Sequence, residues 1–281
     1  MKPYERENVD IAWCPGCGNF GILKLVETVL EALQAEPRGT VIVSGIGQAA
    51  KTPYYVNANM LGVLHGRAVP VATAVKTANP ELTVVAEGGD GDMYGEGGNH
   101  FIHAVRRNVD IVHIVHNNMV YGLTKGQASP TSRKGFETKV QVEGVGNEPF
   151  NPLAVALALR AGFVARVSIG DPEHARAVLK AAFLHPGYAL VDILQPCVTF
   201  NKLNTYTWFK ENSYRLADTY DASDIGAAMA KAMERLPLPL GILYRDEEAV
   251  TFETRLRHGE KIPLFAVRRN LGEVQRLFDG Y

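Results

Sequence analysis

The chain has 281 residues, of which 46% are hydrophobic and 21% are charged, and this composition is that of a soluble globular protein with a substantial core. Its formal net charge of -1 and the lack of a basic tract argue against a nucleic-acid partner or a membrane surface, and no apolar run approaches the roughly 20 residues of a membrane span. The charged N-terminus does not resemble a secretory signal peptide, so we expect a cytoplasmic protein.

Helical segments alternate with β-branched apolar runs along the first 200 residues. Apolar residues at helical spacing predict helices at 18–34, 98–107, 154–160 and 172–184. For the last helix we expect Asp171 as the N-cap and Pro172 at the first position. Buried parallel strands are predicted at 40–44, 82–86, 110–116, 163–167 and 188–194. The alternation predicts an α/β domain with a doubly wound, mostly parallel sheet over residues 1–200.

The sequence changes in character after residue 200. Residues 201–214 are polar and aromatic, residues 236–240 are interrupted by prolines, and short mixed segments follow. We therefore expect residues 201–281 to form a C-terminal arm or small subdomain that packs on a partner subunit.

Glycine-rich or polar segments follow four of the predicted strands. These segments are residues 45–48, residues 88–92, residues 117–118 and the region of Cys197. Because ligands of open α/β sheets bind at the carboxyl ends of the strands, we expect the four segments to meet at one site.

The third of these segments, Asn117-Asn118, follows Gly89-Asp90-Gly91 after 25 intervening residues. Asp90 supplies a carboxylate and Asn118 an amide oxygen, and the backbone carbonyl of Val120 can complete the oxygen ligands that Mg²⁺ requires beside a diphosphate. Glycines let the diphosphate approach the backbone closely. Alone, Gly-Asp-Gly is an ordinary turn, but with this spacing and strand context it is typical of thiamine-diphosphate enzymes.

An ordered set of motifs over most of residues 10–205 resembles the β subunit of 2-oxoacid:ferredoxin oxidoreductases, of the 2-oxoglutarate type. The motifs are Trp13-Cys14-Pro15-Gly16-Cys17-Gly18, His65-Gly66-Arg67, the segment 97–104, Tyr121–Gln127 and the segment 195–200. The resemblance implies oxidative decarboxylation of a 2-oxoacid, such as 2-oxoglutarate or pyruvate, with coenzyme A and ferredoxin. It also implies a heterotetramer or larger complex, in which a partner α subunit supplies the aminopyrimidine half of the thiamine site.

The chain has three cysteines, and two of them lie in one short motif. In a protein with no export signal, this pattern indicates metal or redox chemistry before a structural disulfide. The resemblance implies that Cys14, Cys17 and Cys197 are ligands of a 4Fe–4S cluster. Gln48 occupies the position where many family members have the fourth cysteine. A cluster with a non-cysteine or exogenous ligand, a three-iron or absent cluster, and a ligand from the partner subunit all remain open.

Two further interpretations of the cysteines do not involve iron. Buried inert thiols are common, although they fit Cys197 better than the pair in the motif. A zinc site would lack a ligand unless His65 or His185 reached it.

Three further residues are candidates for catalysis or substrate binding. Lys51 and Lys125 are suitable partners for the carboxylates of a 2-oxoacid, although most lysines are solvated surface residues. His65 suits a donor to the diphosphate or an acid–base group, although a structural histidine is as common. The remaining residues expected to contact the cofactor are Gly47, Gly89, Gly91, Asp92, Gly122, Leu123 and Thr124.

The sequence thus predicts the diphosphate-binding subunit of a 2-oxoacid:ferredoxin oxidoreductase. One alternative is a subunit of a non-redox, thiamine-dependent 2-oxoacid decarboxylase or carboligase. Another is a non-catalytic assembly subunit with a vestigial site.

Overall fold

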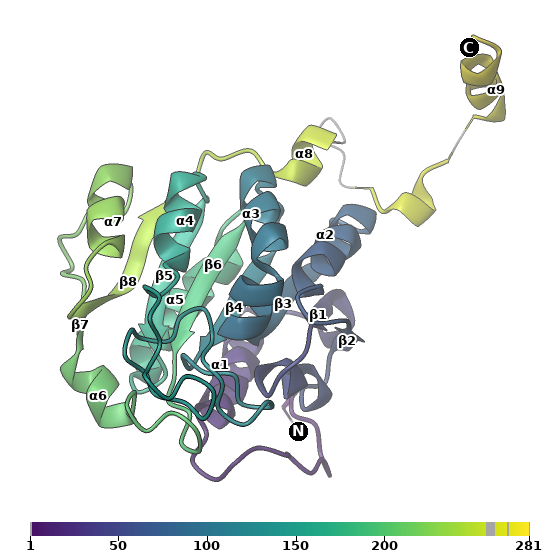
Figure 1. The fold of residues 1–281 in the computed structure, drawn as a ribbon. Coiled ribbons are helices and arrows are strands. Elements are labelled where there is room, and N and C mark those ends of the chain that lie inside the picture. The colour runs from purple at the N-terminus through teal and green to yellow at the C-terminus, as the bar shows by residue number, and fades with distance from the viewer. Residues whose placement is uncertain (1, 257–261, 269, 281) are drawn as a thin grey trace.

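A mostly parallel sheet forms the centre of the computed structural model, which describes residues 2–256, 262–268 and 270–280. The strands lie in the order β2-β1-β3-β4-β6-β5-β8-β7 (Figure 1). Their bounds are β1 Thr40–Ser44, β2 Asn59–Gly62, β3 Thr83–Gly89, β4 Val112–Asn117, β5 Phe163–Ser168, β6 Ala189–Leu194, β7 Ser213–Arg215 and β8 Leu238–Arg245. Neighbouring strands are parallel, except that β8 runs antiparallel to β5.

Helices cover both faces of this sheet. The α-helices are α1 Gly18–Ala32, α2 Ala68–Ala78, α3 Gly98–Arg107, α4 Pro152–Ala158, α5 Pro172–Leu184, α6 Tyr206–Glu211, α7 Ile225–Ala232, α8 Phe252–Leu256 and α9 Leu271–Asp279. Short 3₁₀ turns span Pro37–Gly39, Ala49–Tyr54 and Leu264–Ala266, and a π-helix, η3, spans Gly91–Glu96. Helices α1 and α5 pack on one face, whereas α2, α3, α4 and α7 pack on the other (Figure 1). Among the described helices, none is both long enough and apolar enough to cross a bilayer.

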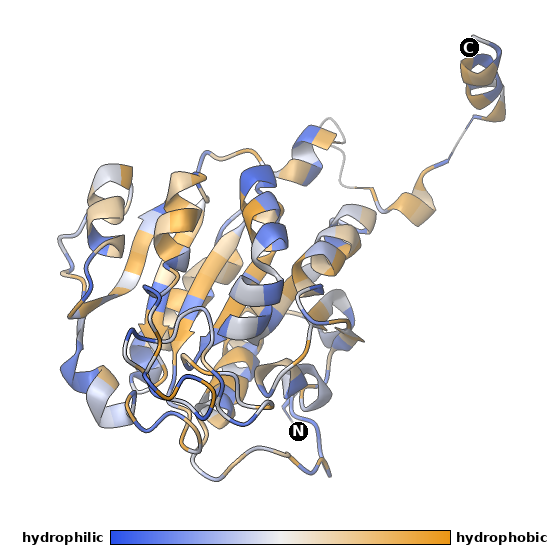
Figure 2. Cartoon of the chain, in the orientation of Figure 1, coloured by the Kyte–Doolittle hydropathy of each residue, from blue (hydrophilic) through white to orange (hydrophobic). Residues whose placement is uncertain are grey.

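The central strands form because their side chains are buried on both faces. Every residue of β1, β4, β5 and β6 is buried, which explains why these strands are rich in apolar residues, and Figure 2 shows the apolar band along the middle of the sheet. Helix α5 begins as predicted, with Pro172 at its first turn and the Asp171 carboxylate accepting a hydrogen bond from the His174 amide. The predicted α/β class with a mostly parallel sheet is confirmed.

Elements that were not predicted lie mainly outside the buried centre. Strand β2 is largely exposed, so it lacks an apolar run. Strands β7 and β8 come from the segment that was expected to be an arm or subdomain, and they extend the same sheet. Pro239 lies inside β8 and interrupts the β-branched pattern that normally marks a strand.

The end of the chain differs from this body. Helix α7 packs against α4, whereas α9 lies apart from the sheet in Figure 1 and has no buried residue. Residues 257–261, 269 and 281 of the expected arm lie outside the described residues.

Candidate functional site

The four motif-bearing segments meet at one edge of the sheet. Strands β1, β3, β4 and β6 are consecutive neighbours and all parallel, so their carboxyl ends lie together. In the register of β3 and β4, Gly89 is opposite His116, and Asn117 is opposite Leu194 in β6. The segments that follow these strands therefore surround a common site.

Asp90 occupies the centre of this edge. Strand β3 ends at Gly89, and Asp90 leads directly into the π-helix η3. The side chain is 1% exposed, and its Oδ2 accepts hydrogen bonds from the Ser129 and Thr131 hydroxyls, each at 2.5 Å. Burial raises the pKa of Asp90 to about 6, although these hydroxyls oppose the shift. The chain thus holds a buried carboxylate whose charge is only partly compensated.

The two asparagines at the end of β4 have separate roles. Asn117 faces the core: its Oδ1 accepts from the Thr131 hydroxyl at 2.9 Å, and its Nδ2 donates to Asp192 at 3.0 Å. Asn118 lies on the site side, where its Oδ1 accepts from the Val120 amide at 3.1 Å. The Asp90 carboxylate and the Asn118 amide group carry oxygen atoms of the kind that a hard divalent cation binds.

Ser129 and Thr131 were not predicted from the sequence. They lie in a long irregular segment between β4 and α4, with no periodic pattern around them. Their partner Asp90 is 39 and 41 residues away in the sequence, so no local signal identifies the pair.

Gly91 allows an aromatic side chain to lie directly against the start of η3. A Cβ atom at position 91 would overlap the ring of Tyr121. The Tyr121 hydroxyl in turn donates to Glu96 at 3.1 Å. This contact fixes Tyr121, the residue directly after Val120, against the turn that carries Asp90.

Asp92 and His65 form a second polar group beside η3. His65 Nδ1 lies 2.6 Å from Asp92 Oδ1, and the same oxygen accepts from the amides of Gly66 at 2.8 Å and Ile46 at 3.3 Å. Burial raises the pKa of Asp92, although these donors oppose it. Asp92 therefore ties three loops together and orients His65.

The segment Tyr121–Gln127 forms a small closed loop with an exposed tip. The Tyr121 amide donates to the Gln127 carbonyl at 2.8 Å, and the Gly126 amide donates to the Tyr121 carbonyl at 2.9 Å. Leu123, Thr124 and Lys125 are exposed at the tip. Lys51 lies instead beside the N-terminal segment, with its Nζ 3.4 Å from the Ala12 carbonyl. The two lysines therefore lie on different segments of the chain, and their predicted role toward the substrate stays a prediction.

The three cysteines come from two segments that pack together. The Cys17 amide donates to the Cys14 carbonyl at 3.0 Å, and an added Cβ at Gly16 would lie 3.9 Å from Val198, next to Cys197. Burial raises the pKa of the Cys17 thiol, and the nearby Cys197 and Cys14 thiols add to the shift.

No three His, Cys, Asp or Glu side chains in the described parts of the chain form a group that could hold a single metal ion. His65 is engaged with Asp92, and the His185 ring packs 5.5 Å from that of Phe163 at the start of β5. These contacts give no support to a zinc site completed by either histidine. An iron–sulfur cluster differs because each thiolate binds a different iron.

A buried polar chain connects the cysteine region with the strands of the site. His116 Nε2 lies 2.8 Å from Glu87 Oε1, and both side chains are fully buried. His116 Nδ1 lies 2.9 Å from Asn19 Oδ1, which also accepts from Gln195 at 2.7 Å. The polar chain runs from β3 through β4 to Asn19 and Gln195, which lie two residues from Cys17 and Cys197 in the sequence.

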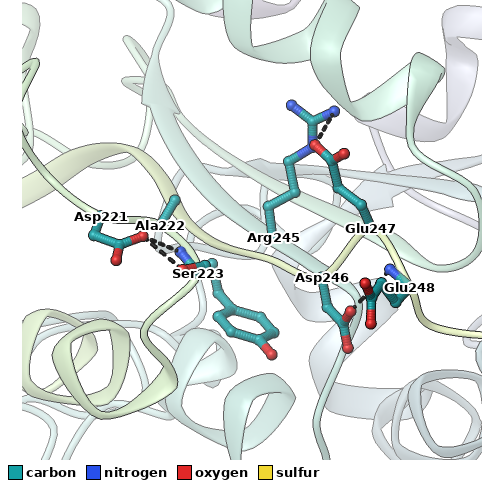
Figure 3. A pocket seen from close by; sticks show the side chains of 8 residues that line it. Asp221, Ala222, Ser223, Arg245, Asp246, Glu247 and Glu248 are labelled. Carbon is teal, nitrogen blue, oxygen red and sulfur yellow. Dashed lines mark hydrogen bonds and ion pairs between the residues drawn. The ribbon is translucent and has the colours of Figure 1, made fainter.

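Two surface pockets help to delimit the site. One, of about 480 Å³, is lined by Tyr121, Ser129 and neighbouring residues and adjoins the partners of Asp90. The other, of about 450 Å³, is drawn in Figure 3. There Arg245 pairs with Glu247, and this arginine lies opposite Phe163, the first residue of β5. The second pocket is therefore near the amino ends of the parallel strands, whereas Asp90 lies at their carboxyl ends.

Comparison with known proteins places the chain in a family. Residues 41–193 match the family model of the thiamine pyrophosphate enzyme, C-terminal TPP binding domain, and residues 197–261 match the C-terminal model of the pyruvate ferredoxin oxidoreductase beta subunit. The chain is 43% identical over 263 residues to 2-oxoacid:ferredoxin oxidoreductase 1, subunit beta, of Aeropyrum pernix, in an alignment that covers 89% of this chain and 83% of the relative. The chain belongs to the family of 2-oxoacid:ferredoxin oxidoreductase β subunits.

Two other members of this family show the same relationship. The 2-oxoglutarate oxidoreductase subunit KorB of Mycobacterium tuberculosis is 44% identical over 192 residues, covering 68% of this chain and 52% of the relative. A solved 2-oxoglutarate:ferredoxin oxidoreductase from Magnetococcus marinus, with 2-oxoglutarate, coenzyme A and succinyl-CoA bound, matches with a TM-score of 0.91 and 36% identity over 99% of this chain and 96% of that one. The predicted family is confirmed, and the named relatives support the ferredoxin-linked function over the non-redox alternative.

The contact of Gly91 with Tyr121 can be tested by substitution. We expect Gly91→Ala to lower the free energy of unfolding by about 1–3 kcal/mol, because the new methyl group overlaps the ring. Gly98→Ala is the matched control, since a Cβ there meets nothing within 4 Å. Denaturant unfolding measures both. In a Tyr121→Ala background the cost of Gly91→Ala should disappear; the same cost in both backgrounds would refute the contact as its cause.

Proposed function

We propose that this chain binds the diphosphate half of thiamine diphosphate in an enzyme that oxidatively decarboxylates 2-oxoglutarate with coenzyme A and passes electrons to ferredoxin. The observation that carries the proposal is Asp90, a buried carboxylate at the carboxyl edge of the sheet in a chain that matches the TPP-binding domain. Asn118 follows β4, the strand paired with the one that ends just before Asp90. The substrate is favoured because the names of the Mycobacterium and Magnetococcus relatives specify 2-oxoglutarate.

The residues of the site fit a magnesium diphosphate. The Asp90 carboxylate, the Asn118 amide oxygen and the Val120 carbonyl would hold Mg²⁺, which takes its remaining ligands from phosphate and water. The first amides of η3, beside Gly91, are suited to a phosphate because they begin a helix. Bound thiamine diphosphate supplies the nucleophile and the electron sink for decarboxylation. The chain contributes position and charge compensation.

The cysteines provide the proposed exit for electrons. Cys14, Cys17 and Cys197 would bind an iron–sulfur cluster, since thiolates are its usual ligands and the two segments that carry them are packed together. This region is joined to the strands of the site by the buried chain of Glu87 and His116. The cluster would thus lie near the thiamine site.

The surface around the site supports a partner subunit. Apolar side chains are exposed on the loops after β1, β2, β4 and β6, namely Ile46, Leu64, Leu123 and Leu203. A group of exposed apolar residues around a polar site is typical of an interface. An α subunit that supplies the aminopyrimidine half would cover this edge. The exposed apolar residues Leu271, Leu277 and Phe278 of α9 suit the C-terminal arm to the same role.

The proposal is tested on the complex of this chain with its α subunit, purified without oxygen. We expect ferredoxin reduction that requires both 2-oxoglutarate and coenzyme A, and its loss in Asp90→Asn. Release of CO₂ without ferredoxin reduction would instead establish the non-redox alternative. Thiamine diphosphate binding that is unaffected by Asp90→Asn or by removal of Mg²⁺ would show that the site is vestigial.

The raised pKa of Asp90, about 6, predicts the pH dependence of metal binding. Because the folded value lies above the ordinary 3.8, protonated Asp90 stabilises the metal-free fold below pH 3.8, and this contribution is lost as the pH rises through about 6. Mg²⁺ compensates the ionised form, so its affinity should fall about tenfold for each pH unit below about 6.

Calorimetric titration with Mg²⁺ in the presence of thiamine diphosphate measures this dependence. The thermal stabilisation by Mg²⁺ should also be larger at pH 7.5 than at pH 5. Asp90→Asn serves as the control, because it should bind weakly and without the pH dependence. An affinity that is equal at both pH values in the unsubstituted chain would refute ionisation of Asp90 as the cause.

Lys125 is proposed to pair with the distal carboxylate of 2-oxoglutarate, because it lies at the exposed tip of the loop after Asn118. We expect Lys125→Ala to raise the KM for 2-oxoglutarate about 10- to 100-fold, since a hydrogen bond to a charged group contributes roughly 1.5–3 kcal/mol. The KM for pyruvate, which lacks that carboxylate, should change little. Lys180→Ala, an exposed lysine on α5, is the control. Equal effects on the two substrates would exclude the charge pairing.

A further inference from the structure

The chain offers three thiols to the proposed iron–sulfur cluster, which has four irons in its 4Fe–4S form. Its sequence contains three cysteines in total, and all of them are free. A 4Fe–4S cluster bound by them has one iron without a thiolate from this chain. We propose that Gln48 supplies the fourth ligand through its side-chain Oε1, so that one iron of the cluster differs chemically from the other three. This inference rests on the proposed function.

The position of Gln48 is fixed next to the cysteine motif. Its backbone carbonyl accepts a hydrogen bond from the Trp13 indole at 2.8 Å, and Trp13 immediately precedes Cys14. Trp13 is itself held by edge-on contacts with Phe20 and Tyr55, at ring distances of 5.3 and 4.9 Å. The glutamine is thus anchored to the loop that carries two of the three thiols.

The side chain of Gln48 has an unused acceptor. Oε1 is buried and has no hydrogen-bond partner in the protein, an arrangement that ordinarily costs about 1–3 kcal/mol. Its Cγ lies 3.7 Å from the position of a Cβ on Gly122, so the side chain reaches the Tyr121–Gln127 loop, whereas its backbone carbonyl is bonded to Trp13 of the cysteine motif. A metal bond would satisfy this oxygen.

A second glutamine with an unpartnered Oε1 is a weaker candidate. Gln195 also has an unpartnered Oε1, but its Nε2 donates to Asn19 at 2.7 Å and fixes the amide in the buried polar chain. The oxygen is pressed against Gly18, where an added Cβ would lie 2.5 Å from it. Gln195 thus belongs to the packing of α1 on the sheet.

An amide oxygen changes the properties of the cluster in a definite direction. Because it is neutral, the cluster carries one negative charge fewer than with a fourth thiolate. Replacing thiolates with neutral ligands raises the reduction potential of iron–sulfur centres. The iron bound by Gln48 is also held less tightly. Mild oxidation should therefore convert the 4Fe–4S²⁺ cluster into 3Fe–4S⁺, with release of Fe²⁺ and transfer of one electron to the oxidant.

The test compares the unsubstituted αβ complex with Gln48→Leu and Gln48→Cys, all purified without oxygen and enriched in ⁵⁷Fe. Iron and sulfide analysis, Mössbauer spectroscopy and a redox titration are measured before and after treatment with ferricyanide. We expect one distinct iron in the unsubstituted complex and loss of one iron in Gln48→Leu. Gln48→Cys should abolish the distinct iron, lower the midpoint potential and resist ferricyanide. Bound thiamine diphosphate confirms that each variant is folded.

The other outcomes separate the ligand role of Gln48 from the proposed function. If Gln48→Leu matches the unsubstituted complex in iron content, Mössbauer spectrum and potential, Gln48 is not a ligand, and the proposed function stands. A three-iron cluster in the anaerobic, untreated complex would likewise overturn the inference alone. A complex that binds thiamine diphosphate but contains neither iron nor sulfide would overturn the electron exit in the proposed function as well.

Discussion

A buried carboxylate that lacks full compensation is the constraint on which this site depends. An ionised side chain is unstable inside a protein unless donors or a cation replace the lost water. Asp90 accepts hydrogen bonds from the Ser129 and Thr131 hydroxyls, yet burial still raises its pKa to about 6. The fold thus preserves a demand for positive charge at the end of a central strand, and the proposed magnesium diphosphate would meet that demand.

The surroundings of Asp90 are rigid because they are bonded into the core. Thr131 bridges Asp90 to Asn117, and Asn117 donates to Asp192, whose carboxylate is fully buried and pairs with Arg166 at 2.8 Å. Removing one partner of such a buried pair typically costs about 3–5 kcal/mol, so these side chains have little freedom. The end of strand β4 therefore provides a fixed support for Asn118, one of the proposed metal ligands.

The sequence predicts those parts of the molecule whose residues carry their own signal. Buried strands such as β4 and capped helices such as α5 follow from apolar runs and from Asp171-Pro172. Strand β8 does not, because Pro239 breaks its pattern although the sheet still accepts it. The hydroxyls on Asp90 come from an irregular loop and the His116–Glu87 pair from two strands, and only the folded chain brings such partners together. The inference about Gln48 needed both the sequence and the structure. The family resemblance indicates that a cysteine is missing at this position, and the structure shows that the Gln48 Oε1 has no hydrogen-bond partner.

The most direct test of the account is the position of the metal in the loaded complex. The αβ complex with thiamine diphosphate is crystallised with Mn²⁺ in place of Mg²⁺, and the metal is located by its anomalous scattering. The account predicts one peak within bonding distance of the Asp90 carboxylate, the Asn118 amide oxygen and the diphosphate. A diphosphate bound away from the carboxyl edge, or a metal that does not touch Asp90, would contradict it.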